Sequence, residues 1–245
     1  MSPTIRDEPA TELEDVRAGR LPARYGYQMQ NVLLERLAPL LQPGVAVLDV
    51  GAGRSPTIAP EVRPPGSRYV GLDISAQELG QAEPSAYDER IVHDVSEPLT
   101  VERRFDIAIS WQVLEHVRPV DRAFENLRLA LRPGGTLLAQ LSGSYAAFSV
   151  LARVIPHGLR VRAMTRFLGH PEELKFPTQY DRCHARALRQ MLAPWSSVEI
   201  VPFYRGADYL RAFRPLQRAY LAYETAVERR SIEDLATHYL VVARR

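Results

Sequence analysis

The chain has 245 residues, of which 46% are hydrophobic and 24% charged, and its formal net charge at pH 7 is +2. This length fits one large α/β domain with room for an insertion, and the near balance of charge excludes nucleic acid as the main electrostatic partner. The single cysteine, Cys183, excludes an internal disulfide, and no stretch approaches the roughly 20 apolar residues of a membrane span.

The amino-terminal stretch, residues 1–24, is polar, acidic and interrupted by proline, and it lacks the apolar core of a signal peptide. It predicts either a flexible arm or a lid over the active site, and it favours a cytoplasmic protein. Tyr25 and Tyr27 follow; they either close over a ligand or pack as ordinary aromatic side chains.

Apolar residues then recur at helical spacing and predict a helix over 28–41, which the sequence QPG ends.

Short apolar runs alternate with helical or loop stretches from residue 45 onward, and a helix is predicted at 120–131. This alternation is typical of a doubly wound, mostly parallel, Rossmann-like sheet, and runs that are apolar on both faces suit a sheet covered by helices. The predicted strands are residues 45–50, 67–73, 89–94, 105–110, 135–141, 198–203 and 237–244.

Two stretches depart from this rhythm. Residues 142–180 contain no clean strand and carry arginines among apolar residues over 145–170, which predicts a helical cap or a contact with a membrane surface or a greasy, anionic substrate. After a predicted helix at 185–192, residues 205–236 show helical spacing interrupted by Pro215, as expected of a lid or a homodimer contact. We therefore expect one domain over 25–245 with cap insertions at about 142–180 and 205–236.

Acidic residues and glycines stand where the predicted strands end. Asp49 ends the first strand before Gly51 and Gly53, Asp73 ends the second about 20 residues further on, and Asp94 ends the third. In doubly wound sheets, ligands bind beyond the carboxyl ends of the strands. Glycines let the backbone approach a ligand closely, and an acid in the position of Asp73 accepts hydrogen bonds from both ribose hydroxyls. The pattern favours an adenosine-containing ligand, although each of these acids could instead cap a turn.

The missing third glycine distinguishes between adenosine ligands. A dinucleotide-binding loop would place glycine at the position of Pro56, and Asp49 would repel a diphosphate. A cationic ammonium and sulfonium would instead be attracted, and S-adenosylmethionine carries both.

Five segments in this order and spacing resemble the class I S-adenosylmethionine-dependent methyltransferases, in particular the small-molecule branch with a VLEHV segment. These segments are VLDVGAGRS, YVGLDIS, HDV, FDIAISWQVLEHV and LRPGGTLLAQL, within residues 45–141. The resemblance implies a seven-stranded sheet with an antiparallel last strand, and S-adenosyl-L-methionine as cofactor.

The resemblance also implies roles for individual residues. Asp49, Gly51 and Gly53 would line the methionine moiety, with Arg54 either bonding its carboxylate or facing solvent. The remaining cofactor residues would be Asp73 at the ribose, Ile74 and Val95 beside the adenine, Asp94 at the adenine amino group, and Ser110 and Gln112 near the transferred methyl.

Methyl transfer needs a base only when the acceptor must lose a proton, and histidine suits that role. The candidates are His116, His184 and, in the predicted cap, His157 and His170, of which we select His116 and His184. Any of these histidines could instead be structural, and Glu115 and His116 could simply brace the loop after the fourth strand. Tyr180 and Arg182 match positions that border the acceptor pocket in relatives. No metal-ligand cluster is evident, so we expect no metal.

The sequence therefore predicts an enzyme, a methyltransferase acting on a small molecule or a glycan or lipid intermediate, with oxygen as the acceptor atom. Two alternatives stay open: a NAD-dependent oxidoreductase, and a catalytically silent methyltransferase fold that serves as a partner subunit.

Overall fold

The computed structural model describes residues 16–26, 28–99, 105–146, 149–150, 179–210 and 213–245. Seven strands of these residues form one sheet in the order β3-β2-β1-β4-β5-β7-β6. The strands are β1 (Ala46–Val50), β2 (Arg68–Asp73), β3 (Glu89–Val92), β4 (Phe105–Trp111), β5 (Leu131–Ser142), β6 (Ser197–Phe203) and β7 (His238–Arg244). The strands from β3 to β5 run parallel, and β7 is antiparallel to both β5 and β6. The predicted fold class is confirmed.

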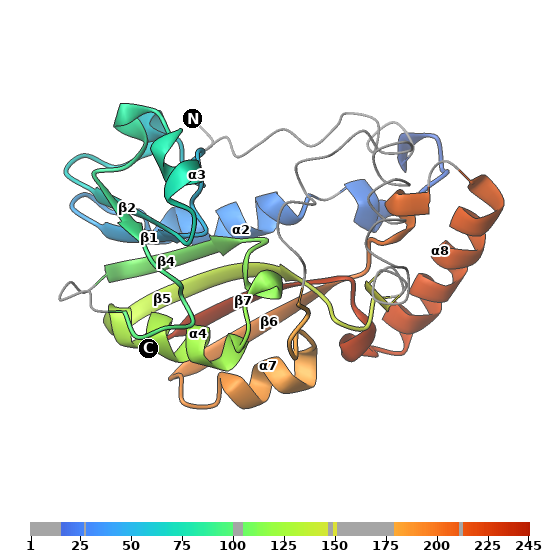
Figure 1. Ribbon diagram of the computed structural model, residues 1–245. Coiled ribbons are helices and arrows are strands. Elements are labelled where there is room, and N and C mark those ends of the chain that lie inside the picture. Colours follow the sequence, from blue (N-terminus) through green and yellow to red (C-terminus); the bar gives the residue numbers. More distant parts are fainter. Residues whose placement is uncertain (1–15, 27, 100–104, 147–148, 151–178, 211–212) are drawn as a thin grey trace.

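Helices cover both faces of the sheet (Figure 1). Helix α2 (Met29–Leu37) lies on one face, and α4 (Val120–Ala130) and α7 (Ala185–Met191) lie on the other. Helix α4 buries side chains at helical spacing, Val120, Phe124 and Leu127 among them. Short α3 (Ala76–Gly80) follows β2. In the described part of the chain, no helix is both long and apolar enough to cross a bilayer.

Helix α8 (Arg214–Arg229) occupies the connection between β6 and β7 and lies at one end of the sheet (Figure 1). Pro215 stands in its first turn, where the missing N–H has no helical partner to lose, so it starts this helix and does not interrupt it. The expected interruption was wrong. Leu21 of the predicted amino-terminal arm and neighbouring Tyr25 form a small apolar cluster with Ala207, and Tyr220 and Leu221 of α8 pack against this cluster.

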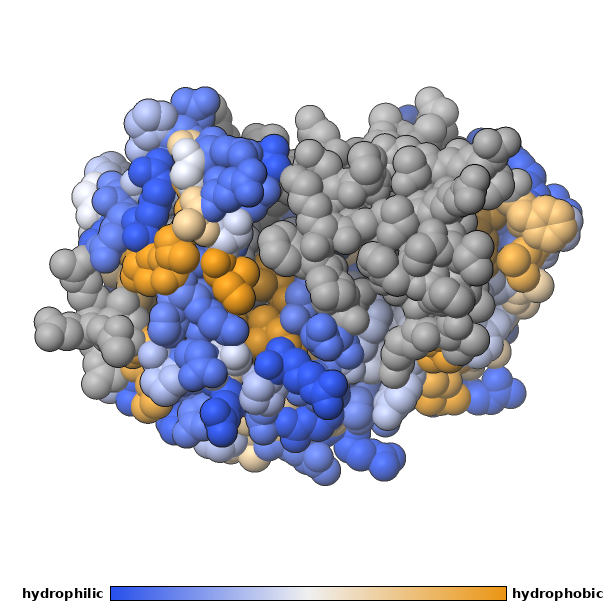
Figure 2. All heavy atoms as spheres, viewed as in Figure 1, coloured by the Kyte–Doolittle hydropathy of each residue, from blue (hydrophilic) through white to orange (hydrophobic). Residues whose placement is uncertain are grey.

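The surface in Figure 2 is mostly polar, with apolar side chains gathered in a band over the middle of the described face. Ile74, directly after β2, is 60% exposed, and Phe213, directly before α8, is 61% exposed. Most of residues 142–180, including most of the predicted cap and of the 145–170 stretch, lies outside the described residues.

Candidate active site

The predicted site residues lie beyond the carboxyl ends of the parallel strands. We call residues 49–57, 73–75 and 93–96, which follow β1, β2 and β3, the glycine-loop side. We call residues 110–116, 140–146 and 179–184, which gather around the ends of β4 and β5, the histidine side.

Gly51 is where the two sides touch. Its φ is +70°, and a Cβ there would lie 2.2 Å from Cγ2 of Val113, which follows β4. Only glycine fits such an approach without displacing a stiff β-branched side chain. Gly53 also has a positive φ, +53°, but a Cβ there would meet only the Asp73 carboxylate, at 3.9 Å.

Asp49 is fully buried, and its carboxylate accepts three hydrogen bonds. Thr57 donates its N–H and its hydroxyl at 2.7 Å each, and the Tyr69 hydroxyl donates at 2.7 Å. Burial raises the pKa of Asp49, and these hydrogen bonds oppose that rise. The side chain thus braces the glycine loop from beneath. Contact of Asp49 with the methionine moiety stays a prediction.

Asp73 joins the end of β2 to the same loop. One carboxylate oxygen accepts the N–H of Gly53 at 2.9 Å, and the other accepts the N–H of Ser75 at 2.8 Å. Each oxygen keeps a further lone pair, so the carboxylate is held in place and can still accept two ribose hydroxyls. Arg54 points elsewhere, since its guanidinium is paired with Glu78 of α3 at 2.9 Å.

The adenine side of the predicted site has one exposed and one buried apolar residue. Ile74 is exposed, whereas Val95 is only 5% exposed and packs in the core. One oxygen of Asp94 accepts the N–H and the hydroxyl of Ser96, at 2.9 and 2.8 Å. The turn is held from behind by Asn126 of α4, which donates to the carbonyls of Val95 and Glu97 at 2.9 and 2.7 Å.

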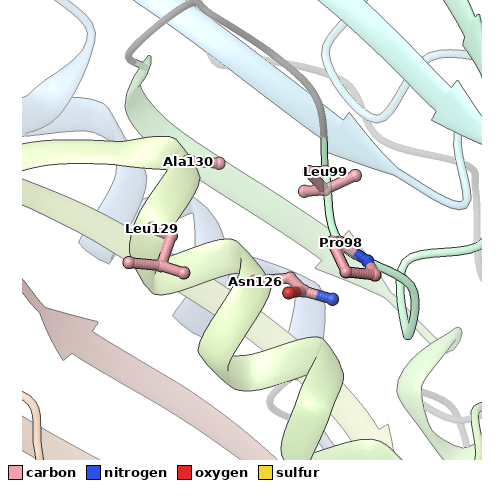
Figure 3. A pocket seen from close by; sticks show the side chains of 5 residues that line it. All are labelled: Pro98, Leu99, Asn126, Leu129 and Ala130. Atoms are coloured by element: carbon pink, nitrogen blue, oxygen red, sulfur yellow. The ribbon is translucent and has the colours of Figure 1, made fainter.

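Figure 3 shows this same Asn126 at a small hollow of about 100 Å³ between α4 and the segment after β3. A second hollow, of about 370 Å³, lies between α7 and β6. Neither contains a predicted site residue. Among the described residues, no group of three or more His, Cys, Asp or Glu is placed to hold a metal ion.

On the histidine side, Glu115 ties three segments together. Its Oε1 accepts the N–H of Ser142 at the end of β5, at 3.1 Å, and its backbone carbonyl accepts the N–H groups of Gln179 and Tyr180, at 2.9 Å each. The side chain is 2% exposed, and burial raises its pKa, opposed by nearby His116. This geometry is that of a brace.

Tyr180 and Arg182 belong to a segment that is clamped onto the start of α4. Asp181 accepts the N–H of Val120 at 3.1 Å, and Arg182 pairs with Asp121 at 2.7 Å. This pairing raises the pKa of Arg182 and lowers that of Asp121. The Arg182 side chain is 48% exposed, while Tyr180 is buried.

The two candidate bases, His116 and His184, lie in the segments on either side of the contacts that Asp181 and Arg182 make with α4. His116 ends the short helical turn after β4, and His184 immediately precedes α7. Ser144 donates its N–H to the carbonyl of Cys183 at 2.6 Å, and the ring of neighbouring Tyr145 lies 4.8 Å from that of His184. Burial lowers the pKa of His184, so this imidazole is neutral at pH 7.

Buried polar atoms without a hydrogen-bond partner are concentrated on the histidine side. Five of them are there: Ser110 Oγ, Glu115 Oε2, His116 Nδ1, Gln140 Oε1 and His184 Nδ1, whereas the glycine-loop side has one, His93 Nε2 just after β3. Such atoms are costly unless a water or a ligand satisfies them. The described residues therefore fit a polar ligand at this edge.

Backbone strain is found at the same place. In the described part of the chain, Gln112, Tyr180, Arg182 and Ser231 are the non-glycine residues with positive φ, and the first three are predicted site residues. Such strain is concentrated at functional sites. Gln112 is also held by a hydrogen bond from its N–H to the carbonyl of Gln140, at 2.9 Å.

Tyr25 is placed away from a ligand-facing position. It is 1% exposed, its hydroxyl donates to Glu224 of α8 in a short contact, and it accepts the N–H of Ala207 at 3.1 Å. Neighbouring Arg24 pairs with Glu228 at 2.9 Å. Of the two readings of Tyr25, packing is the one that the structure supports. Tyr27 lies outside the described residues.

Residues 23–214 match a family model described as a methyltransferase domain. The chain belongs to this family. The class predicted from the sequence, S-adenosylmethionine-dependent methyltransferases, is thereby confirmed together with its fold, and S-adenosylmethionine is the methyl donor of that class.

Curated relatives of this methyltransferase include two ubiquinone biosynthesis O-methyltransferases. That of Agrobacterium fabrum is 32% identical over 149 residues, which are 55% of this chain and 57% of the relative. That of Rhizobium etli is 27% identical over 190 residues, 72% of this chain and 73% of the relative. The chain spans about half the length of the first relatives it matches.

Among solved structures, phosphoethanolamine N-methyltransferase 2 of Haemonchus contortus, in complex with phosphomonomethylethanolamine and S-adenosylhomocysteine, has a TM-score of 0.54 and 14% identity. The match covers 92% of this chain and 54% of that one. The carbon methyltransferase CurJ has a TM-score of 0.50 and 16% identity, over 96% and 58%. These likenesses concern the fold.

Three contributors to the site were missed by sequence reasoning: Thr57, Tyr69 and Gln140. Thr57 and Tyr69 reach Asp49 only through the tertiary structure, so no local pattern reveals them. Gln140 did leave a signal, because it is a polar residue inside the apolar run LLAQL of a strand whose faces are both covered.

Proposed function

We propose that this methyltransferase transfers a methyl group from S-adenosyl-L-methionine to an oxygen of a small molecule or a glycan or lipid intermediate. The observation that carries the proposal is the Asp73 carboxylate, fixed by Gly53 and Ser75 yet able to accept two more hydrogen bonds beside exposed Ile74. The names of the curated relatives support oxygen as the acceptor atom.

The chain's residues would divide the work as follows. Asp73 holds the ribose, Ile74 and the Asp94–Val95 turn receive the adenine, and the loop with Gly51 and Gly53, braced by Asp49, receives the methionine end. Ser110 and Gln112 lie toward the transferred methyl. The cofactor, when bound, supplies a methyl already activated by the sulfonium, so the protein mainly orients the acceptor and excludes water.

The acceptor hydroxyl must lose its proton as its oxygen forms the new bond to carbon. His184, or else His116, would take that proton, and a neutral imidazole is the form that can. Tyr180 and Arg182 would border the acceptor. The proposal also keeps the caps at about 142–180 and 205–236, a flexible arm or lid at residues 1–24, a membrane contact through 145–170 and a homodimer contact.

The test is calorimetric titration with S-adenosylhomocysteine, with NAD as the competing ligand. Asp73→Asn should weaken binding of S-adenosylhomocysteine by about 1.5–3 kcal/mol, since hydrogen bonds to a charged acceptor are lost. Asp88→Asn is the matched control, because Asp88 accepts the N–H of Tyr69 at the other end of β2, at 2.6 Å; its affinity should stay unchanged.

Isotopically labelled methyl donor, incubated with the protein and a cell extract, would then reveal the acceptor by mass spectrometry. Unchanged affinity in Asp73→Asn would contradict the ribose assignment. Binding of NAD in place of S-adenosylhomocysteine would overturn the function, and cofactor binding without any labelled product would favour the silent partner subunit.

A further inference from the structure

Gln140 is an anomaly in the centre of the sheet. It belongs to β5 between Ala139 and Leu141, and its side chain is completely buried. Its Oε1 has no hydrogen-bond partner, and its Nε2 has only the sulfur of Met29, at 4.0 Å. A buried amide with its oxygen unpaired destabilises a fold, whereas leucine or methionine in its place would pack at no such cost. The amide is therefore poorly explained by stability.

The position of Gln140 relates it to the proposed chemistry. In the sheet it pairs with Trp111 of β4 on one side and with Leu240 of β7 on the other. Its backbone carbonyl holds Gln112, the strained residue predicted near the transferred methyl. The amide thus lies one strand pairing from the proposed point of transfer, on the side of β4 away from the glycine loop.

One neighbour of this amide is an adaptable side chain, because the sulfur of Met29 lies 4.0 Å from Nε2. Met29 begins α2 and is 6% exposed, and an unbranched thioether changes rotamer more readily than a branched or aromatic side chain. Met29 can therefore change rotamer beside the amide without movement of the sheet.

We propose that Gln140 determines acceptor specificity: its side-chain carbonyl accepts a hydrogen bond from a hydroxyl or N–H group of the methyl acceptor, with Met29 giving way. This inference rests on the proposed function. A site built to bond such a group discriminates strongly against analogues that lack it, because the buried amide is then left unpaired.

The test compares Gln140→Met, which keeps the shape and removes the amide, with Gln140→Glu, which keeps an acceptor oxygen. Melting temperature, affinity for S-adenosylhomocysteine and labelled methyl incorporation into an organic extract of the source cells are measured for each. Leu138→Met is the matched control, since Leu138 is fully buried on the same face two residues earlier.

If Gln140 serves the acceptor, the two variants should rank oppositely in stability and in methyl incorporation. Gln140→Met should melt about 2–6 °C higher than the wild type and lose roughly tenfold or more of its methyl incorporation, with unchanged affinity for S-adenosylhomocysteine. Gln140→Glu should melt lower, because it buries an acid, yet incorporate more methyl than Gln140→Met. Leu138→Met should match the wild type in both.

Two results would overturn the inference: Gln140→Met that melts higher with full incorporation, or Gln140→Met that melts lower than the wild type. The first result would mean that the amide destabilises the fold and has no role in methyl transfer. The second would mean that the amide stabilises the fold. If the wild type itself neither binds S-adenosylhomocysteine nor incorporates label, the proposed function fails, and the role of Gln140 falls with it.

Discussion

The glycine-loop side and the histidine side differ in how many of their buried polar atoms have hydrogen-bond partners. On the glycine-loop side, Asp49, Asp73 and Asp94 each accept two or three hydrogen bonds from the chain. On the histidine side, five buried polar atoms have none. A side completed by its own chain is preorganised, and a side left incomplete is suited to a ligand that brings the missing partners. Under the proposed function, the first side would bind the cofactor and the second side the methyl acceptor.

The largest effect should come from the contact that joins the two sides. Gly51→Ala forces a Cβ to within 2.2 Å of Val113 at a φ of +70°, and we expect a loss of about 3–5 kcal/mol in the free energy of unfolding. Urea denaturation measures it. Gly53→Ala is the control and should lose only about 1–2 kcal/mol; equal losses would mean that Val113 yields easily.

The histidine side should dominate the pH dependence of transfer. Burial lowers the pKa of His184, so this base stays neutral until the pH falls below 6.5. The rate should therefore hold from neutral pH down past 6.5 and then fall on the acid side as the imidazole takes a proton. His184→Gln should remove this acid limb and reduce the rate by about 10²-fold or more.

A matched His116→Gln variant separates the two candidate bases. If the acid limb persists in His184→Gln and vanishes in His116→Gln, His116 is the base. At a single pH, both variants should bind S-adenosylhomocysteine as the wild type does, since neither histidine lies on the glycine-loop side.

A smaller effect should reveal the brace beneath the glycine loop. Thr57→Val removes the hydroxyl that donates to Asp49 at 2.7 Å, and we expect about 1–2 kcal/mol of lost stability. Affinity for S-adenosylhomocysteine should fall modestly with it, because the loop is less firmly held. Full affinity in the destabilised variant would show that the loop is ordered independently of Asp49.

The smallest structural effect should be at Arg182. Its ion pair with Asp121 is about half exposed, so Arg182→Ala should cost less than about 1 kcal/mol of stability. Any larger defect in methyl transfer would then report on the acceptor. Asp121→Ala breaks the same pair and is the control; equal activity in both variants would remove Arg182 from the substrate site.

Sequence reasoning predicted the strands to within a residue or two in most cases, because strands buried on both faces need continuous apolar runs. The clearest departure is β5. The sequence predicts a strand from residue 135, but β5 begins at Leu131, with an irregularity in its pairing with β4. The sequence assigns Gly53 and Asp73 to one site, whereas the hydrogen bond between them comes only from the structure.

The burial of Asp49 could not be predicted in that way. Its hydrogen-bond donors are Thr57, eight residues on, and Tyr69 in the next strand. The pattern of charged residues in the sequence is the same whether an acid faces a ligand or the core. The clamp of Asp181 and Arg182 onto α4 likewise joins residues about 60 positions apart, which helical or strand periodicity does not encode.

The buried contact between Tyr25 and Glu224 sets an order of events during synthesis. Tyr25 leaves the ribosome 199 residues before Glu224, and its hydroxyl lacks both partners until Ala207 and then Glu224 have emerged. The segment just ahead of α2 therefore cannot complete its contacts with α8 until that helix has been made. A nascent chain halted before α8 should accordingly be cleaved by added protease near Tyr25, and the released full-length protein should resist.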